Sequence, residues 1–355
     1  GPVPVYMAHS LGGGAENYLQ DAIDADLARG QGAIVLRVGG SHRFQVEVRT
    51  PEGDVSGMTG SLEFLQTLLD PLGALRIVYS CGVGDPDPVS LPDVLLSLRR
   101  PGREDRVEVL FHDFFPISPS YCLLDQDGVY RGPVTGETAD PAHSTQRADG
   151  TRIGLADWQA AWGRLLEAAA QVHVFSRDSR DQVLAAYPDV AGKIVVTPHS
   201  LLRDVPPLTV AQSGKTVIGV LGNIGYQKGA ALLGGLARRA QAHPDLSLVL
   251  IGNLDPNYSL PASAPVHGNY RIEDIGRLVH DYGITCWLIP SIWPETFSYT
   301  THECLATGLP VYAFDIGAQG GAVARAPNGH PIHFAPDADL VQNILEEITH
   351  GAASR

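Results

Sequence analysis

Two carboxylates, Glu295 and Glu303, stand eight residues apart where an apolar run at 286–290 gives way to a helical pattern. A helix of small residues is expected to begin near Ser298 and to end before Gly308. At 3.6 residues per turn, eight residues leave two side chains about 80° apart around a helix axis. The two carboxylates therefore do not form one acid/base pair. We expect Glu295 to reach past the helix N-terminus and Glu303 to lie beside it.

The backbone between the two glutamates offers a second kind of group. The N–H groups near Phe297, Ser298 and Tyr299 open the expected helix, and such an N-terminus binds phosphate. Ionised carboxylates accept hydrogen bonds from hydroxyls, which suits sugars. A diphosphate between two sugars is a nucleotide sugar, so the stretch indicates a nucleotide-sugar site. The alternative is a pair of solvated glutamates near a helix start, where the helix dipole favours negative charge.

The stretch 294–311 also resembles the signature of retaining family-four glycosyltransferases with the GT-B architecture. Proline precedes the first glutamate, and Gly-Leu-Pro-Val follows the small-residue helix. The resemblance implies that Glu295 contacts the donor sugar and that Glu303 contacts the ribose of the nucleotide. It also implies two Rossmann-like, doubly wound domains that face a cleft.

Gly12, Gly13 and Gly14 follow the first expected strand and precede a helix. Glycines at such a turn let the backbone approach a ligand and leave the helix N-terminus open to an anion. The resemblance places Gly13 and Gly14 near the donor phosphates, and a tight strand–helix turn is the alternative. The run is not a dinucleotide-binding fingerprint, because residues 37–40 read Arg-Val-Gly-Gly where that motif has an acid.

The segment 221–229 occupies the matching position in the second half and resembles the family's Gly-Arg…Lys-Gly segment. The resemblance implies that Lys228 neutralises the donor diphosphate. Asn223 stands where the family has arginine, which leaves one fixed cation fewer. Either another basic residue replaces it, with Arg271 and Arg325 as candidates, or neutral hydrogen-bond donors do. Asn223 is counted among the donor-binding residues.

His112 ends a strand of the first half and resembles the family histidine that lies near the donor sugar. A satisfied interior histidine is the alternative. Asp113 is expected either to orient His112 or to bind an acceptor hydroxyl. The run 117–125 resembles bacterial polysaccharide transferases, including rhamnosyltransferases. Tyr270 and Arg271 stand where the family has nucleobase contacts, and either could stack on a base.

Composition excludes several classes of protein. The net charge of −14 argues against a nucleic-acid partner. The cysteines form no CxxC pair, and neither a leader nor a membrane-length apolar stretch is seen, so we expect the cytoplasm or the inner face of the membrane. Asp-x-Asp triplets at 85–87 and 125–127 are expected by chance among 39 acidic residues, so no metal or cofactor is predicted. The opening Gly-Pro resembles a protease scar, which makes a longer parent chain one expectation.

Short β-branched runs alternate with helical patterns along the chain, which predicts an α/β fold with parallel sheets covered by helices. Residues 116–150 break this alternation and are expected to be functional or mobile. Pro206-Pro207 within 203–214 is the expected linker. The predicted domains are a Rossmann-like acceptor domain at 1–205, a nucleotide-sugar domain at 206–338, and a helix at 339–355 that could pack back on the first domain. Strands are expected at 3–8, 33–38, 44–49, 76–80, 107–111, 172–175, 194–197, 216–221, 246–251, 285–289 and 311–314, and helices at 15–29, 62–69, 91–98, 154–169, 178–186, 229–241, 273–282, after 298 and at 339–349.

These observations predict a retaining, metal-independent glycosyltransferase of the O-antigen type. It would move a hexose or deoxyhexose from a UDP-, GDP- or dTDP-linked donor to a hydroxyl of a glycan or lipid-linked glycan. Lys228 and backbone N–H groups would stabilise the leaving diphosphate, Glu295 would hold sugar hydroxyls, and His112 would position the sugar. The rivals are a GT-B epimerase or phosphorylase-like enzyme, and a non-catalytic nucleotide- or glycan-binding module of a larger synthase. A nicotinamide dehydrogenase is disfavoured because its fingerprint is missing.

Overall fold

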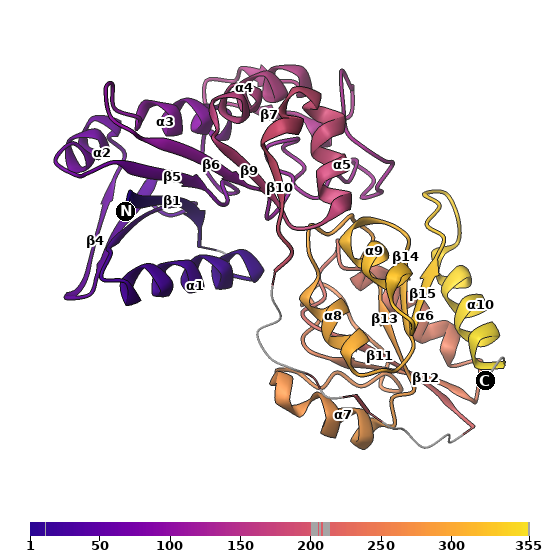
Figure 1. The fold of residues 1–355 in the computed structure, drawn as a ribbon. Coiled ribbons are helices and arrows are strands. Elements are labelled where there is room, and N and C mark those ends of the chain that lie inside the picture. The colour runs from indigo at the N-terminus through magenta and orange to yellow at the C-terminus, as the bar shows by residue number, and fades with distance from the viewer. Residues whose placement is uncertain (11, 200–204, 206, 209–213, 354–355) are drawn as a thin grey trace. The chain divides into compact units, whose positions relative to one another are not determined.

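The chain forms two compact α/β units. The computed structural model describes residues 1–10, 12–199, 205, 207–208 and 214–353 (Figure 1). The first unit contains Gly1–Asp127 and Gly132–Pro198, and the second contains Gly128–Arg131 and His199–Arg355. Most of the predicted linker at 203–214 lies outside the described residues.

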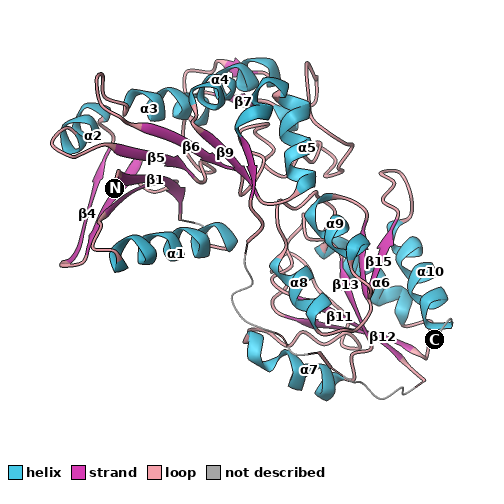
Figure 2. Cartoon of the chain, in the orientation of Figure 1, coloured by secondary structure: helices cyan, strands magenta, loops and turns pink. Residues whose placement is uncertain are grey.

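In the described part of the chain, the first unit is built on an eight-stranded sheet in the order β10-β9-β6-β5-β1-β2-β3-β4. Figure 1 and Figure 2 show α1 on one face of this sheet and α3 and α4 on the other. The elements of this unit are β1 (Val3–His9), α1 (Gly14–Ala28), β2 (Ala33–Val38), β3 (Phe44–Thr50), β4 (Gly53–Thr59), α2 (Leu62–Leu69), β5 (Leu75–Tyr79), α3 (Leu91–Ser97), β6 (Arg106–Leu110), the short pair β7 (Thr145–Gln146) and β8 (Arg152–Ile153), α4 (Leu155–Ala168), β9 (Gln171–Val174), α5 (Arg177–Ala186) and β10 (Ile194–Val196).

One edge of this sheet departs from the predicted parallel pattern. β2, β3 and β4 pair antiparallel, whereas β1 pairs parallel with both β2 and β5. β4 was not predicted from the sequence. Its residues are almost all exposed, so its run Gly-Asp-Val-Ser-Gly-Met-Thr lacks the apolar alternation of a half-buried strand. Pairing with β3 holds it in an extended conformation instead.

The second unit has a five-stranded sheet in the described part of the chain, in the order β12-β11-β13-β14-β15, with every pairing parallel. Because parallel strands are covered on both faces, they read as continuous apolar runs, and the predicted α/β architecture is confirmed. The elements of this unit are β11 (Thr216–Leu221), α6 (Ala230–Ala240), β12 (Leu246–Ile251), α7 (Ile275–Tyr282), β13 (Cys286–Ile289), α8 (Tyr299–Ala306), β14 (Val311–Phe314), α9 (Gly317–Arg325), β15 (Gly329–Ile332) and α10 (Leu340–Ala353).

α9 and β15 were not predicted from the sequence either. The start of α9 reads Gly-Ala-Gln-Gly-Gly, and glycine is a poor helix former. The structure supplies a packing reason for these glycines. A Cβ on Gly320 would lie 2.5 Å from the carbonyl oxygen of Phe314, so only a residue without a side chain lets α9 approach the end of β14.

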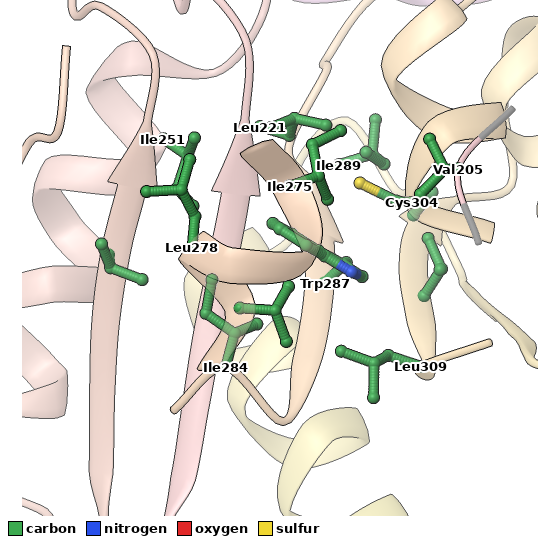
Figure 3. Close-up of a cluster of buried hydrophobic side chains, with 14 of the residues drawn as sticks. Val205, Leu221, Ile251, Ile275, Leu278, Ile284, Trp287, Ile289, Cys304 and Leu309 are labelled. Carbon is green, nitrogen blue, oxygen red and sulfur yellow. The ribbon is translucent and has the colours of Figure 1, made fainter. Parts of the chain in front are cut away.

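The core of the second unit surrounds Trp287 on β13. Figure 3 shows side chains of α7 and β13 meeting around this ring. Trp287 is fully buried, and its indole N–H donates to the Thr307 hydroxyl at 3.0 Å. Gly219 of β11 lies directly against the ring face, because a Cβ there would be 2.7 Å from two of its carbon atoms.

α10 and part of the loop at 116–150 also contact the second unit. α10 packs on α6 and β15, and Arg239 pairs with Asp339 at 2.6 Å. From the loop at 116–150, Gly128 accepts a hydrogen bond from the Tyr226 hydroxyl at 3.2 Å. Among the described residues, no helix has the length and apolar character that a bilayer span requires.

The contact between Gly219 and Trp287 predicts the effect of one methyl group. Gly219→Ala should lower the free energy of unfolding by about 1–3 kcal/mol, because the core must shift to accommodate it. Gly234→Ala is the matched control within α6, since the atom nearest to its Cβ, on Arg238, lies at an ordinary 3.5 Å. Urea denaturation of both variants checks this. Equal stability of the two would contradict the packing described here.

Candidate functional site

The turn after β11 brings Lys228 to the carboxyl edge of the second sheet. Gly229 has φ +88°, and a Cβ there would lie 2.2 Å from the carbonyl oxygen of Pro290, so the turn packs against the end of β13. The N–H of Ile292 donates to the carbonyl of Gln227 at 3.0 Å. Ligands of open α/β sheets bind at this edge. The glycine therefore sets the position of the neighbouring lysine.

Lys228 and Glu295, both predicted as site residues, are brought together. The Lys228 Nζ lies 3.6 Å from the Glu295 Oε2. The glutamate side chain is only 4% exposed, whereas that of the lysine is 34% exposed. The Ser291 hydroxyl donates to the other carboxylate oxygen, Oε1. A buried carboxylate needs such partners, and here each oxygen has one.

Gln319, which the sequence analysis missed, holds the loop that carries Glu295. Its side-chain N–H donates to the carbonyl of Trp293 at 2.7 Å, and its side-chain oxygen accepts from the N–H of Glu295 at 3.1 Å. Gln319 is fully buried. The sequence does contain a signal, because Gln319 is the one amide side chain in the small-residue run 317–321 directly after β14.

Glu303 lies on α8 within the field of the same lysine. Burial raises the pKa of Glu303, and the positive charge of Lys228 partly opposes this. Burial also raises the pKa of Tyr270, and the charge of Glu303 adds to that rise. Lys228 therefore faces two acids, and the predicted base-contact residue Tyr270 lies close to the predicted ribose-contact residue.

Aromatic rings gather at the start of α8. Ser298 caps this helix, as expected, and its hydroxyl accepts from Thr301 at 2.8 Å. The ring of Tyr299 stacks on His199 with centroids 5.4 Å apart. The ring of Phe297 meets Tyr299 edge to face at 5.0 Å. Burial lowers the pKa of His199 to about 4, so this ring is neutral at pH 7. His199, which is not among the predicted site residues, lies against the helix start.

Asn223 stands at the position of the family's arginine, and the candidate replacements Arg325 and Arg271 lie in different parts of the second unit. The Asn223 side chain is exposed and accepts a hydrogen bond from Asn253 at 2.9 Å. Burial lowers the pKa of His302 on α8, and the nearby positive charge of Arg325 lowers it further. Arg271 is exposed just before α7, with its carbonyl accepting from the N–H of Asp274.

In the first unit, the predicted residues lie at the carboxyl ends of β1 and β6. Gly13 caps α1 with φ +87°, and Gly14 is the first residue of that helix. The His112 ring stacks on Phe175 with centroids 4.7 Å apart, and it meets Tyr18 of α1 edge to face at 5.0 Å. These rings fix the orientation of the imidazole beside the start of α1.

Asp113, predicted to orient His112 or to bind an acceptor hydroxyl, has partners within the first unit. Its carboxylate is buried, accepts from the N–H of Phe115 at 2.9 Å, and lies 3.6 Å from the Cys81 thiol, which donates to it. Burial raises the pKa of Asp113 to about 6. These partners turn the carboxylate into the interior of the unit.

The acidic triplets take part in local structure. Asp85 is buried and accepts hydrogen bonds from the Arg43 guanidinium and from the N–H of Asp87. Asp125 accepts from the N–H of Asp127 at 3.0 Å. Within the described residues, no three His, Cys, Asp or Glu side chains gather as metal ligands.

The buried Asp113 predicts a dependence of stability on pH. Its folded-state pKa lies above its ordinary value, so its contribution is fully present near pH 4 and is lost as the pH rises to 6. Over pH 4 to 6 the wild type should lose on the order of 2 kcal/mol of unfolding free energy relative to Asp113→Asn, because both titrations are only partly complete at the ends of that range. Denaturant titrations at pH 4, 5 and 6 measure this difference. The exposed control Asp127→Asn should run parallel to wild type, and a parallel course for Asp113→Asn would refute the assignment.

Comparison with known proteins supports the fold. No protein-family model and no curated protein sequence matches the chain. Several solved structures resemble it over nearly its whole length. The lipopolysaccharide outer core galactosyltransferase WaaB, in its apo form, is 12% identical with a TM-score of 0.58, covering 98% of this chain and 91% of its own. HepE of Anabaena in complex with UDP is 14% identical with a TM-score of 0.58, covering 98% and 90%. Sucrose-phosphate synthase from Thermosynechococcus elongatus is 15% identical with a TM-score of 0.58, covering 99% and 90%. The chain therefore has the GT-B fold, with two Rossmann-like units of the kind found in these glycosyltransferase structures.

Proposed function

We propose that the chain is a retaining glycosyltransferase that uses a nucleotide diphosphate sugar. The observation that carries this proposal is the position of Lys228, which pairs with Glu295 and acts on Glu303 beside the start of α8. A cation and a helix N-terminus suit a diphosphate, and the two carboxylates suit the hydroxyls of the sugars on either side. The fold agrees, because solved structures that share it include a galactosyltransferase and a protein bound to UDP.

The leaving diphosphate gains negative charge as the bond to the sugar stretches. Lys228 and the N–H groups at the start of α8 would stabilise that charge, so the reaction is proposed to need no metal. Glu303 would accept hydrogen bonds from the ribose hydroxyls, and Tyr270 would lie against the base. Glu295 would accept from hydroxyls of the transferred sugar.

The partners of Glu295 bear on how the configuration is retained. Its Oε1 accepts from Ser291 and its Oε2 faces Lys228. A carboxylate held on both oxygens is a weak nucleophile, because its charge is already compensated. This favours departure of the diphosphate and attack of the acceptor on the same face of the sugar over a covalent intermediate on Glu295.

The first unit would supply the acceptor side. His112 would lie near the transferred sugar, and Gly13 and Gly14 would approach the donor phosphates. The likeness of 117–125 to bacterial polysaccharide transferases favours a hexose or deoxyhexose donor, carried on UDP, GDP or dTDP, and a hydroxyl of a surface glycan or lipid-linked glycan as acceptor. Such a reaction takes place in the cytoplasm, at the inner face of the membrane where the acceptor is lipid-linked.

The rival functions meet specific obstacles. In a nicotinamide-binding protein an acid ends the second strand, but here Arg37 occupies β2 and donates to Glu16 and Glu47. An epimerase would convert the donor without an acceptor, and a binding module would bind it without turnover. Product analysis with and without a glycan acceptor separates these two from a transferase.

The two carboxylates should respond differently to mutation. Glu295→Gln should lower turnover strongly and leave affinity for the free nucleoside diphosphate largely intact, because its proposed partner is the sugar. Glu303→Gln should weaken that affinity by about tenfold, because its proposed partner is the ribose. Calorimetry with the diphosphate and a transfer assay test both. Full activity of the first variant and unchanged affinity of the second would remove the assignment.

Removal of the Lys228 charge should weaken recognition of the phosphates and leave recognition of the nucleoside unchanged. A charged hydrogen bond contributes roughly 1.5–3 kcal/mol, so Lys228→Met should lower nucleoside diphosphate affinity by about tenfold to a hundredfold. Binding of the nucleoside without phosphates should stay unchanged. Lys215, exposed near the amino end of β11, provides a control that removes the same charge elsewhere in the unit.

The Lys228 variant also leaves the buried Glu295 without its cation. The double variant Lys228→Met/Glu295→Gln removes both charges and should restore stability without restoring diphosphate affinity. If Lys228→Met weakens nucleoside and diphosphate binding equally, the lysine acts through folding or base contact, and its phosphate role is wrong.

A further inference from the structure

Extended segments of the second unit end in the same dipeptide at neighbouring positions. One Gly-Asn pair follows β11 and another follows β12. A third comes shortly after Val266, which forms a parallel bridge with Leu250 of β12. We call their side chains the asparagine triad. The pairs are Gly222-Asn223, Gly252-Asn253 and Gly268-Asn269.

The glycines explain why the asparagines lie together. Gly252 has φ +133°, and a Cβ there would be 2.0 Å from the carbonyl oxygen of Gly222. The N–H of Gly268 donates to the carbonyl of Gly252 at 3.0 Å. Gly222 and Gly268 also have positive φ, at +115° and +87°. A side chain at the central glycine would force the backbones apart, so glycine permits the close approach of the strand ends.

The triad is joined by its own amide groups. The Nδ2 of Asn253 donates to the Oδ1 of Asn223 at 2.9 Å and to the Oδ1 of Asn269 at 2.7 Å. Because both acceptors use their carbonyl oxygen, their own Nδ2 groups are turned away from Asn253. All three residues are exposed. Ordering exposed side chains costs conformational entropy, and hydrogen bonds open to water return little, so folding gains little from this arrangement.

The triad lies between two parts of the proposed nucleotide site. At one end, Gly222 lies beside α8, since a Cβ there would be 3.1 Å from the methyl group of Thr300. At the other end, Asn269 directly precedes Tyr270, whose pKa is raised in part by Glu303. The ends of parallel strands are where such folds bind ligands. The triad therefore connects the strand end beside α8 with the segment that carries Tyr270.

We propose that the asparagine triad determines how the donor nucleotide is recognised, with Asn223 donating to a diphosphate oxygen and Asn269 donating to a carbonyl oxygen of the base. Asn253 is a positioning residue that holds both. This inference rests on the proposed function. The proposed site has two acids and one nearby lysine. Neutral amide donors would bind phosphate there without forming ion pairs with Glu295 and Glu303. Preorganised amides also reduce the entropy that binding would otherwise cost.

The experiment measures affinity by calorimetry for the tightest binder among UDP, GDP and dTDP, and for its nucleoside. Asn253→Leu should weaken diphosphate binding by about tenfold, because it releases both neighbours. Asn223→Ala should weaken diphosphate binding and leave nucleoside binding unchanged. Asn269→Ala should weaken both ligands by the same factor. A triad with only a structural role would not produce this split between the two ligands.

Asn257→Ala is the matched control, because Asn257 is an exposed asparagine of the same region that bonds only locally to Asp255 in the described residues. Its affinities should equal those of the wild type, and the melting temperatures of all variants should agree. If the wild type binds a diphosphate and all triad variants bind it equally well, the triad inference is wrong and the proposed function stands. If the wild type binds none of UDP, GDP and dTDP, the proposed function fails and the inference fails with it.

Discussion

The contact between Lys228 and Glu295 is the interaction on which the rest of the second unit's edge depends. A carboxylate that is 4% exposed is stable only with partners on both oxygens, and Ser291 and Lys228 provide them. Two further contacts hold the backbone around Lys228 and Glu295. Gly229 lets the lysine turn approach β13, and Gln319 holds the loop that carries the glutamate. A change at any of these positions would alter where the lysine charge points.

The positive charge of Lys228 matters because the chain as a whole is acidic. The net charge is −14, so the proposed anionic donor would approach against an unfavourable average field. Groups at the proposed site would offset this field locally. Lys228 faces Glu295 and Glu303, the start of α8 contributes its dipole, and the asparagine triad adds donors without charge. Both acids can then remain hydrogen-bond acceptors for hydroxyls. The neutral Asn223, at the position of the family's arginine, agrees with a site that has a single lysine beside two acids.

Much of the fold could be predicted from the sequence because apolar periodicity records burial. β2, β11, β12 and β14 have the expected bounds, because central strands of a covered sheet are mostly apolar. β4 could not be predicted, because its exposed residues carry no burial signal and only its pairing with β3 defines it. α9 was hidden by glycines that exist to permit close packing on β14.

The candidate site was predictable in part for a related reason. Glu295, Glu303 and Lys228 stand next to helix starts, which local sequence marks, and the structure brings these three into one electrostatic group. Their functional roles stay predictions. Gln319 and the asparagine triad depend on contacts between segments far apart in the sequence, which spacing along the chain does not reveal. The direction of the Asp113 side chain could not be predicted, because a strand-end acid next to a histidine gives no sign of which way it turns.

The second unit is proposed to bind a nucleotide diphosphate sugar. The most direct test is the melting temperature of the protein across a panel of UDP-, GDP- and dTDP-sugars, with NAD and the free sugars as comparators. Because a ligand that binds the native state raises its apparent stability, one class of nucleotide sugar should raise the melting temperature progressively with concentration, while the free sugars and NAD should not. A melting temperature that no nucleotide sugar changes at millimolar concentration, or that only NAD raises, would contradict the account.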